Sequence, residues 1–108
     1  MNRFVIVIQP RADAATLEAF TWIAERSPAA AARWLTGLRK ALAKLAEGPL
    51  RHPVALEESE RFGLVIRQSL YGRRRGVYRI LFSVEAGVIS VLAIRHSAQG
   101  PVAPEDER

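Results

Sequence analysis

The spacing of hydrophobic positions changes several times along the chain, and each change marks the start of a new element. Residues 4–8 form an apolar run without polar alternation, which predicts a strand covered on both faces. Apolar residues then recur at helical spacing behind Asp13, a suitable cap residue. The helix that they predict ends near Arg26.

A second helix is expected directly after the first. Ser27 is a favourable N-cap, and Pro28 suits the first helical position, where the N–H that proline lacks is not needed. Gly48-Pro49 ends the pattern. Because the break between the helices is so short, they should fold back as an antiparallel hairpin. The apolar stripe of the second helix consists of Trp34, Leu35, Leu38, Leu42 and Leu45.

The second half of the chain predicts a loop followed by three strands. Residues 49–60 show little periodicity and predict a connecting loop, whose adjacent carboxylates at Glu57 and Glu58 are expected to be solubilising. From Phe62 onward the period is two, which indicates a strand. Two further apolar runs, at residues 77–84 and 88–94, flank a short turn at Glu85-Ala86-Gly87.

These elements predict an α+β fold, composed of an N-terminal strand, an antiparallel helical hairpin and a three-stranded antiparallel meander. The helices would cover one face of the sheet, and the other face would be covered only in part. A length of 108 residues with 49% hydrophobic residues suits one domain, expected over residues 1–98. Residues 99–108 hold prolines among charges and are expected to form a mobile tail.

Composition excludes several classes of site and points to a charged partner. The absence of cysteine excludes disulfides and thiolate sites and fits a reducing compartment, so we expect a cytoplasmic protein. The apolar opening run is too short for a signal-peptide core or a membrane span. With only two histidines, one of them in the proline-rich loop, no metal site is expected. The net charge of +5 would attract polyanions or a strongly acidic protein.

Arginines are concentrated near the predicted meander, where they suit contacts with a nucleic-acid backbone or an acidic protein segment. For the run from Arg73 to Arg75, the alternative is a solvated turn between Gly72 and Gly76. Arg79 interrupts an apolar central strand, so it needs an open groove or a structural partner such as Glu85 or a loop glutamate. The arginines that we expect to contact a target or nucleic acid are Arg67, Arg73, Arg74, Arg75 and Arg95.

His96, at the end of the last strand, suits general acid or base catalysis, although a strand-end histidine bonded to backbone is an alternative. The hairpin register decides whether it can act together with Arg79. If Val84 opposes Val88, Arg79 and Arg95 share a sheet face and His96 points the other way. A slip of one residue would bring Arg79 and His96 to the same face. The sequence leaves both registers open.

Two segments within this order of elements, Tyr-Arg-Ile-Leu-Phe at residues 78–82 and Val-Leu-Ala-Ile-Arg-His-Ser-Ala at residues 91–98, resemble the RelE/ParE superfamily of plasmid-stabilisation toxins. The resemblance spans roughly residues 3–99. It implies a growth-inhibiting toxin of a type II toxin–antitoxin module without a cofactor. Its partner would be an antitoxin whose acidic, amphipathic segment wraps and neutralises it.

The resemblance implies two targets. RelE-like members cleave mRNA on the ribosome, and in that case Arg79 would stabilise the phosphate while His96 or Tyr71 moves protons. ParE-like members inhibit DNA gyrase without nuclease chemistry. The lysine pairs common in such nucleases have no counterpart among these strands, and arginine, with a pKa above about 12, is a poor proton donor. Gyrase is therefore the expected target, with the nuclease as the first alternative and an inactive RNA- or protein-binding scaffold as the second.

Overall fold

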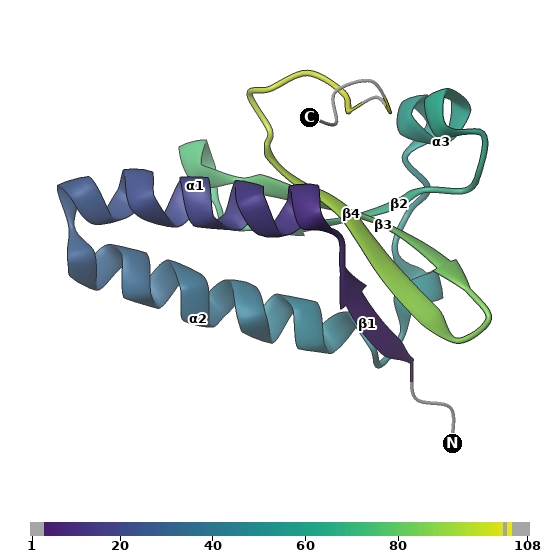
Figure 1. Cartoon of the computed structure of the whole chain (residues 1–108), viewed down its shortest axis with the longest axis horizontal. Coiled ribbons are helices and arrows are strands. Elements are labelled where there is room, and N and C mark those ends of the chain that lie inside the picture. Colours follow the sequence, from purple (N-terminus) through teal and green to yellow (C-terminus); the bar gives the residue numbers. More distant parts are fainter. Residues whose placement is uncertain (1–3, 103, 105–108) are drawn as a thin grey trace.

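The protein has an α+β fold in which a helical hairpin packs on one face of a four-stranded sheet (Figure 1). The computed structural model describes residues 4–102 and 104. Strand β4 (Val88–His96) is antiparallel to β3 (Tyr78–Glu85), which is antiparallel to β2 (Arg67–Tyr71). This confirms the predicted meander. The first strand, β1 (Val5–Ile8), pairs in parallel with β4, so the sheet is mixed.

The hairpin consists of α1 (Pro10–Arg26) and α2 (Pro28–Leu45), as the two helical patterns predict. Ser27 caps α2, because its Oγ accepts a hydrogen bond from the Ala30 N–H at 3.1 Å. The start expected for α1 was wrong, because the helix begins at Pro10 and Asp13 lies inside its first turn. A carboxylate there still interacts favourably with the helix dipole.

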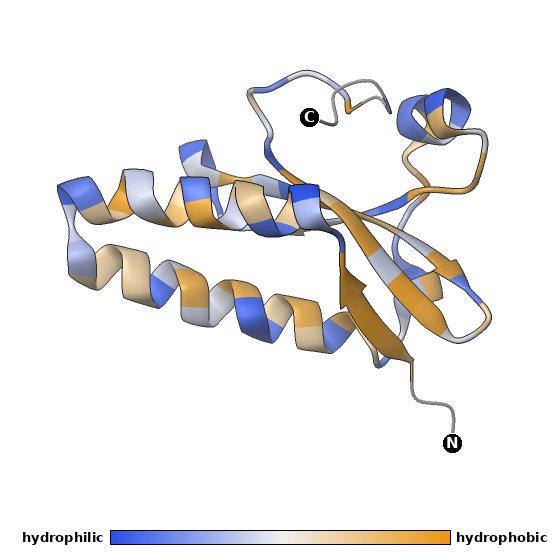
Figure 2. Ribbon diagram, viewed as in Figure 1, coloured by the Kyte–Doolittle hydropathy of each residue, from blue (hydrophilic) through white to orange (hydrophobic). Residues whose placement is uncertain are grey.

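The main core lies between the hairpin and the sheet. Figure 2 shows long hydrophobic stretches on β1 and β4 and mixed colouring on the helices, as expected for helices with one buried stripe. Trp34 packs at the border of this core. The buried members of this main core are Ala12, Leu38, Leu45, Ile80, Phe82, Ile89, Val91 and Ile94.

The first strand is not covered on both faces, contrary to the prediction. Val5 is 61% exposed and Val7 is 42% exposed, whereas Ile6 packs against the core under the helices. The reason is that β1 lies at the edge of the sheet. The residues that cover the second face pack on Leu81 and Ala93, which belong to the inner strands β3 and β4.

The segment predicted as a loop contains a 3₁₀ turn, Pro49–Arg51, and a helix, α3 (Leu56–Phe62). The strand expected from Phe62 therefore begins only at Arg67. A helix of 7 residues is too short to display a helical period, and its stability comes from packing on the second face of the sheet. The small core there consists of Ala55, Ile66, Leu81, Ala93 and Val102.

Part of the expected mobile tail packs on the domain. Val102 is buried in the second core, and its backbone N–H donates to Glu58 Oε2 at 3.1 Å. The mobility expected for residues 99–108 stays a prediction, although Val102 itself packs on the domain. Residues 103 and 105–108 of that segment lie outside the described residues. Within the described part of the chain, no helix is long and apolar enough to cross a membrane.

Candidate functional site

The turn and a β-bulge of the β3–β4 hairpin together determine which side chains share a face. Glu85 pairs with Val88, so the turn residues are Ala86 and Gly87, which have φ values of +51° and +78° as a type I′ turn requires. Val84 therefore pairs with Ile89, which is a shift of one residue from the register in which Val84 would oppose Val88. A β-bulge then leaves Leu92 without a partner. Beyond the bulge, each side chain therefore points to the same face as it would if Val84 opposed Val88.

As a result, Arg79 and His96 lie on opposite faces of the sheet. Arg79 pairs with Arg95, and Tyr78 pairs with His96. The turn alone would have brought Arg79 and His96 together, and the bulge separates them.

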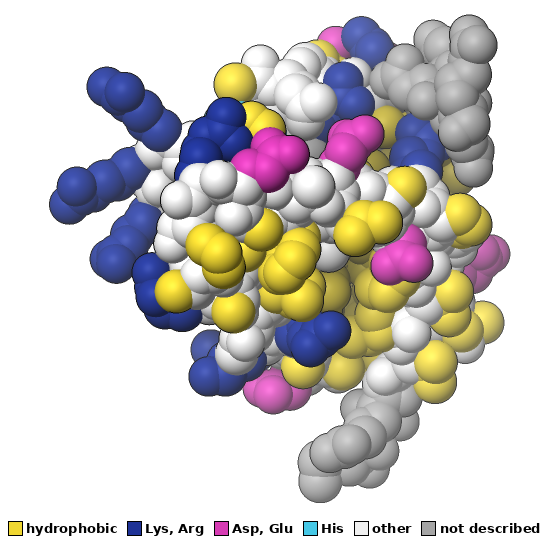
Figure 3. Space-filling model, turned by 60° about the vertical axis from the view of Figure 1, so that its left-hand side comes forward, with side chains coloured by type: hydrophobic (Ala, Val, Ile, Leu, Met, Phe, Trp, Pro, Cys, Tyr) yellow, Lys and Arg dark blue, Asp and Glu magenta, His cyan; other side chains and the backbone are white. Residues whose placement is uncertain are grey.

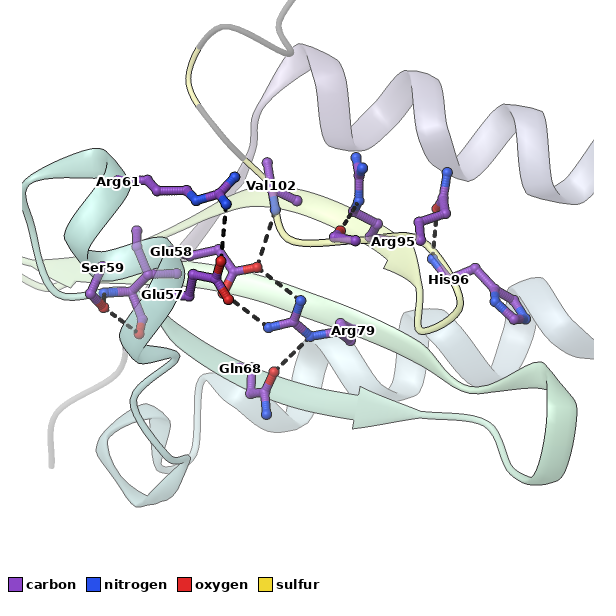
Figure 4. Close-up of polar contacts among 12 residues, drawn as sticks. Glu57, Glu58, Ser59, Arg61, Gln68, Arg79, Arg95, His96 and Val102 are labelled. Carbon is purple, nitrogen blue, oxygen red and sulfur yellow. Dashed lines mark hydrogen bonds and ion pairs between the residues drawn. The ribbon is translucent and has the colours of Figure 1, made fainter.

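Arg79 is held by a buried carboxylate on the face away from the hairpin (Figure 4). Its Nη1 and Nη2 donate to Glu58 Oε2 and Oε1 at 2.8 and 3.0 Å, and its Nε donates to Gln68 Oε1 at 2.8 Å. The Arg79 side chain is 19% exposed and that of Glu58 is 2% exposed. The partner is thus the glutamate that was expected to be solubilising, whereas the neighbouring Glu57 does lie at the surface, paired with Arg61.

Electrostatics keep this pair ionised. Burial acts to raise the pKa of Glu58, but the hydrogen bonds from Arg79 and the Val102 N–H, together with the positive charge of Arg79, outweigh it and leave the pKa below its ordinary value. A phosphate placed against Arg79 would meet a fixed negative charge beside it. The geometry therefore favours a structural role for this arginine.

On the opposite face, both ring nitrogens of His96 contact backbone. Nδ1 accepts a hydrogen bond from the Ala98 N–H at 3.0 Å, which assigns the proton to Nε2, and Nε2 donates to the Arg75 carbonyl oxygen at 2.6 Å. The ring also packs edge-on against Tyr78, with centroids 5.1 Å apart. His96 has the backbone-bonded arrangement that was the alternative to catalysis.

Tyr71 also points into the helix-covered face. Its hydroxyl donates to the Trp34 carbonyl oxygen of α2 at 2.7 Å, and burial raises the pKa of Tyr71. Gly37 allows this approach, because a Cβ there would overlap the Tyr71 hydroxyl. Tyr78 packs against the main core, and burial raises its pKa too. Tyr71 therefore ties β2 to α2.

The arginines expected to bind a target fall into two groups. Arg67 donates to the His52 carbonyl oxygen at 2.8 Å, and Arg95 Nε donates to that of Gly100 at 2.7 Å, so both secure neighbouring loops. The second group is the arginine turn, which we define as residues 72–76. The turn carries the side chains of Arg73, Arg74 and Arg75, and all three are exposed. They form no ion pair or hydrogen bond with any other described residue.

A groove between α1 and β4 is a feature that the sequence analysis missed. It has a volume of about 660 Å³ and lies between the alanine-rich side of α1 and the end of the last strand. Trp22, at this groove, is 57% exposed and stacks under the Arg26 guanidinium at 3.6 Å. The sequence hint was a high density of alanines in the segment that holds Trp22. Its lining includes Arg11, Ala14, Ala15, Ala19, Trp22 and Arg95.

Metal chemistry has no candidate site in the described residues. Within residues 4–102 and 104, no group of three or more histidine, aspartate or glutamate side chains is placed to hold an ion. His52, in the loop, packs edge-on against Phe82 instead.

Comparison with known families identifies the chain. Residues 6–101 match the family described as ParE toxin of type II toxin-antitoxin system, parDE. No curated protein matches the sequence. The family match covers most of the chain and agrees with the strand, helical hairpin and meander. The chain therefore belongs to the ParE toxin family, whose members are the toxins of type II toxin–antitoxin systems and pair with an antitoxin.

Proposed function

We propose that this toxin inhibits growth in the cytoplasm by acting on DNA gyrase, and that it has no nuclease chemistry of its own. The observation that supports the proposal is the placement of the three candidate catalytic groups. Arg79 is paired with Glu58 on one face of the sheet, whereas His96 and Tyr71 are bonded to backbone on the other.

Cleavage of RNA by its own 2′-hydroxyl requires a base at that hydroxyl, an acid at the leaving oxygen and a cation at the phosphate. His96 would have to give up the bond from Ala98 before its Nδ1 could accept a proton. The Tyr71 hydroxyl is directed at α2. The exposed cations nearby are arginines, which do not release protons near neutral pH. These constraints disfavour the ribosome-dependent nuclease.

We further propose that an acidic, amphipathic segment of the antitoxin occupies the groove between α1 and β4. The alanines permit a close approach of backbone, and Trp22 offers a large apolar contact. Arg11 and Arg95 outweigh the one carboxylate of the lining, Glu18, so the groove carries net positive charge. Ala19→Arg should abolish neutralisation by the antitoxin and leave toxicity intact. Ala29→Arg, at an exposed position of α2, is the matched control.

The decisive test compares the two targets directly. We expect the purified toxin to inhibit supercoiling by gyrase and to leave mRNA intact on translating ribosomes, and we expect Tyr71→Phe to behave in the same way. Cleavage of ribosome-bound mRNA that is lost in a folded His96→Ala variant would overturn the proposal in favour of the nuclease. Absence of any growth defect without the antitoxin would favour the inactive scaffold.

A further inference from the structure

The arginine turn has a constrained backbone. Gly72 has a φ of +100°, and a Cβ at this position would overlap the Gly76 carbonyl oxygen. The Gly76 N–H donates to the Arg73 carbonyl oxygen at 3.0 Å, and Arg74 has a φ of +59°. The left-handed conformation is costly for a side-chain-bearing residue, so Arg74 is held there by the closure of the loop.

The turn is also supported from behind. The Nε2 of His96 donates to the Arg75 carbonyl oxygen at 2.6 Å, and the His96 ring packs on Tyr78. Tyr78 packs edge-on against Trp34 of α2, with ring centroids 5.3 Å apart. A chain of edge-on ring contacts, His96 to Tyr78 to Trp34, therefore connects the backbone of the turn to the helical hairpin. The three arginines project from a backbone that these contacts hold in place.

The charge of the turn is not compensated locally. Residues 61–84 contain no aspartate or glutamate, and the nearest buried carboxylate, that of Glu58, is engaged by Arg79. Figure 3 shows basic side chains extending into solvent at one edge of the molecule, apart from the hydrophobic surface at the centre of that view. Three adjacent guanidinium groups with open N–H donors match the oxygens of a phosphate chain.

We propose that the arginine turn is a binding site for the phosphate backbone of double-stranded DNA, with His96 as the positioning residue that holds it in shape. The inference rests on the proposed gyrase function, because the DNA would be the duplex that gyrase engages. An acidic amphipathic peptide is a poorer match, because residues 72–76 offer no apolar surface. Single-stranded RNA is also a poorer match, because the two tyrosines that flank the turn, Tyr71 and Tyr78, are already packed against Trp34.

The test measures binding of the purified full chain to a short fluorescent DNA duplex by anisotropy at several salt concentrations. We expect Arg73→Ala/Arg74→Ala/Arg75→Ala to weaken binding at low salt by about tenfold or more. We also expect it to reduce the slope of log affinity against log salt by about two to three, since each phosphate contact contributes about 0.9. Removal of three exposed cations from α2, in Arg33→Ala/Lys40→Ala/Lys44→Ala, lowers the net charge by the same amount as the arginine-turn variant and should leave the slope nearly unchanged.

A second pair of variants tests the role of His96. His96→Phe keeps a ring against Tyr78 but removes both backbone bonds, and should weaken DNA binding several-fold. His96→Gln, whose amide can still donate to the Arg75 carbonyl oxygen, should restore part of the affinity. If His96→Phe binds DNA as the parent does, while remaining folded, the positioning role is wrong.

Other outcomes separate this inference from the gyrase proposal. Equal loss of binding in the two triple variants, or tighter binding to an RNA of equal length, would overturn the DNA site. Gyrase inhibition that is unchanged in the arginine-turn variant would also overturn it and leave the gyrase function standing. DNA binding that depends on the turn, in a protein that does not inhibit gyrase, would support the site and overturn the gyrase function.

Discussion

Arg79 and Glu58 form a bidentate ion pair that joins β3 to α3 across the second face of the sheet, with both N–O distances at or below 3.0 Å. Through the Val102 N–H, the same carboxylate also holds the segment that follows β4. Three separate parts of the chain therefore meet at one buried charge. The pair organises the second core, and its contribution can be measured as stability.

Breaking this pair should be costly, and replacing both partners should be much less so. Arg79→Met leaves a buried carboxylate without its cation, so we expect the free energy of unfolding to fall by about 3 kcal/mol. Arg79→Met/Glu58→Leu should recover a large part of that loss. Urea titration of the single and double variants provides the measurement. Strictly additive effects would show that the two residues are not coupled.

Glu58 should make the protein sensitive to acid. Its pKa in the folded protein lies below the ordinary value of 4.5, so the unfolded chain takes up the proton first as the pH falls. The resulting stabilisation is complete above pH 4.5 and is lost as the pH drops through the lowered pKa. Urea midpoints between neutral and acid pH should show this loss, and Glu58→Gln should lack that part of it.

His52 should contribute in a different pH window. Burial lowers its pKa from 6.5, and the positive charges of Arg51 and Arg67 lower it further. The folded protein therefore holds His52 neutral, and stability should decline as the pH falls from 6.5 toward the lowered pKa. His52→Phe, which can keep the ring contact with Phe82, should remove this decline. An unchanged pH profile in the variant would refute the assignment.

Tyr71→Phe should separate packing from catalysis. It removes the hydrogen bond to the Trp34 carbonyl oxygen and keeps the ring, so we expect a loss of about 1 kcal/mol in the free energy of unfolding. Toxicity in cells should not change. Gly37→Ala, which forces the Tyr71 hydroxyl away, should destabilise the protein more. Loss of toxicity in a Tyr71→Phe variant of normal stability would instead make Tyr71 catalytic.

The hairpin turn offers a stabilising substitution. Ala86 has a φ of +51° at a type I′ turn position where asparagine is preferred. Ala86→Asn should therefore raise the free energy of unfolding by about 0.5–1 kcal/mol, with a higher melting temperature. Ala29→Asn, at an exposed helical position, serves as the control and should give no gain.

The sequence by itself determined the order of the first strand, the two long helices and the meander, because local patterns specify them. The spacing of apolar residues predicted both helices, and Ser27-Pro28 predicted their junction. One alternating segment and two apolar runs predicted the meander. The concentration of arginines before β3 was equally visible. These features depend only on neighbouring residues, and all of them persist in the folded protein.

Tertiary structure decided the rest. The short α3, the burial of Glu58 and the docking of Val102 depend on contacts between distant segments, which no local period reports. The faces of Arg79 and His96 were decided by two one-residue shifts, at the turn and at the bulge of Leu92. Each shift alone reverses every side chain beyond it, because successive residues of a strand point to opposite faces. Only the pairing of the complete sheet fixes that outcome.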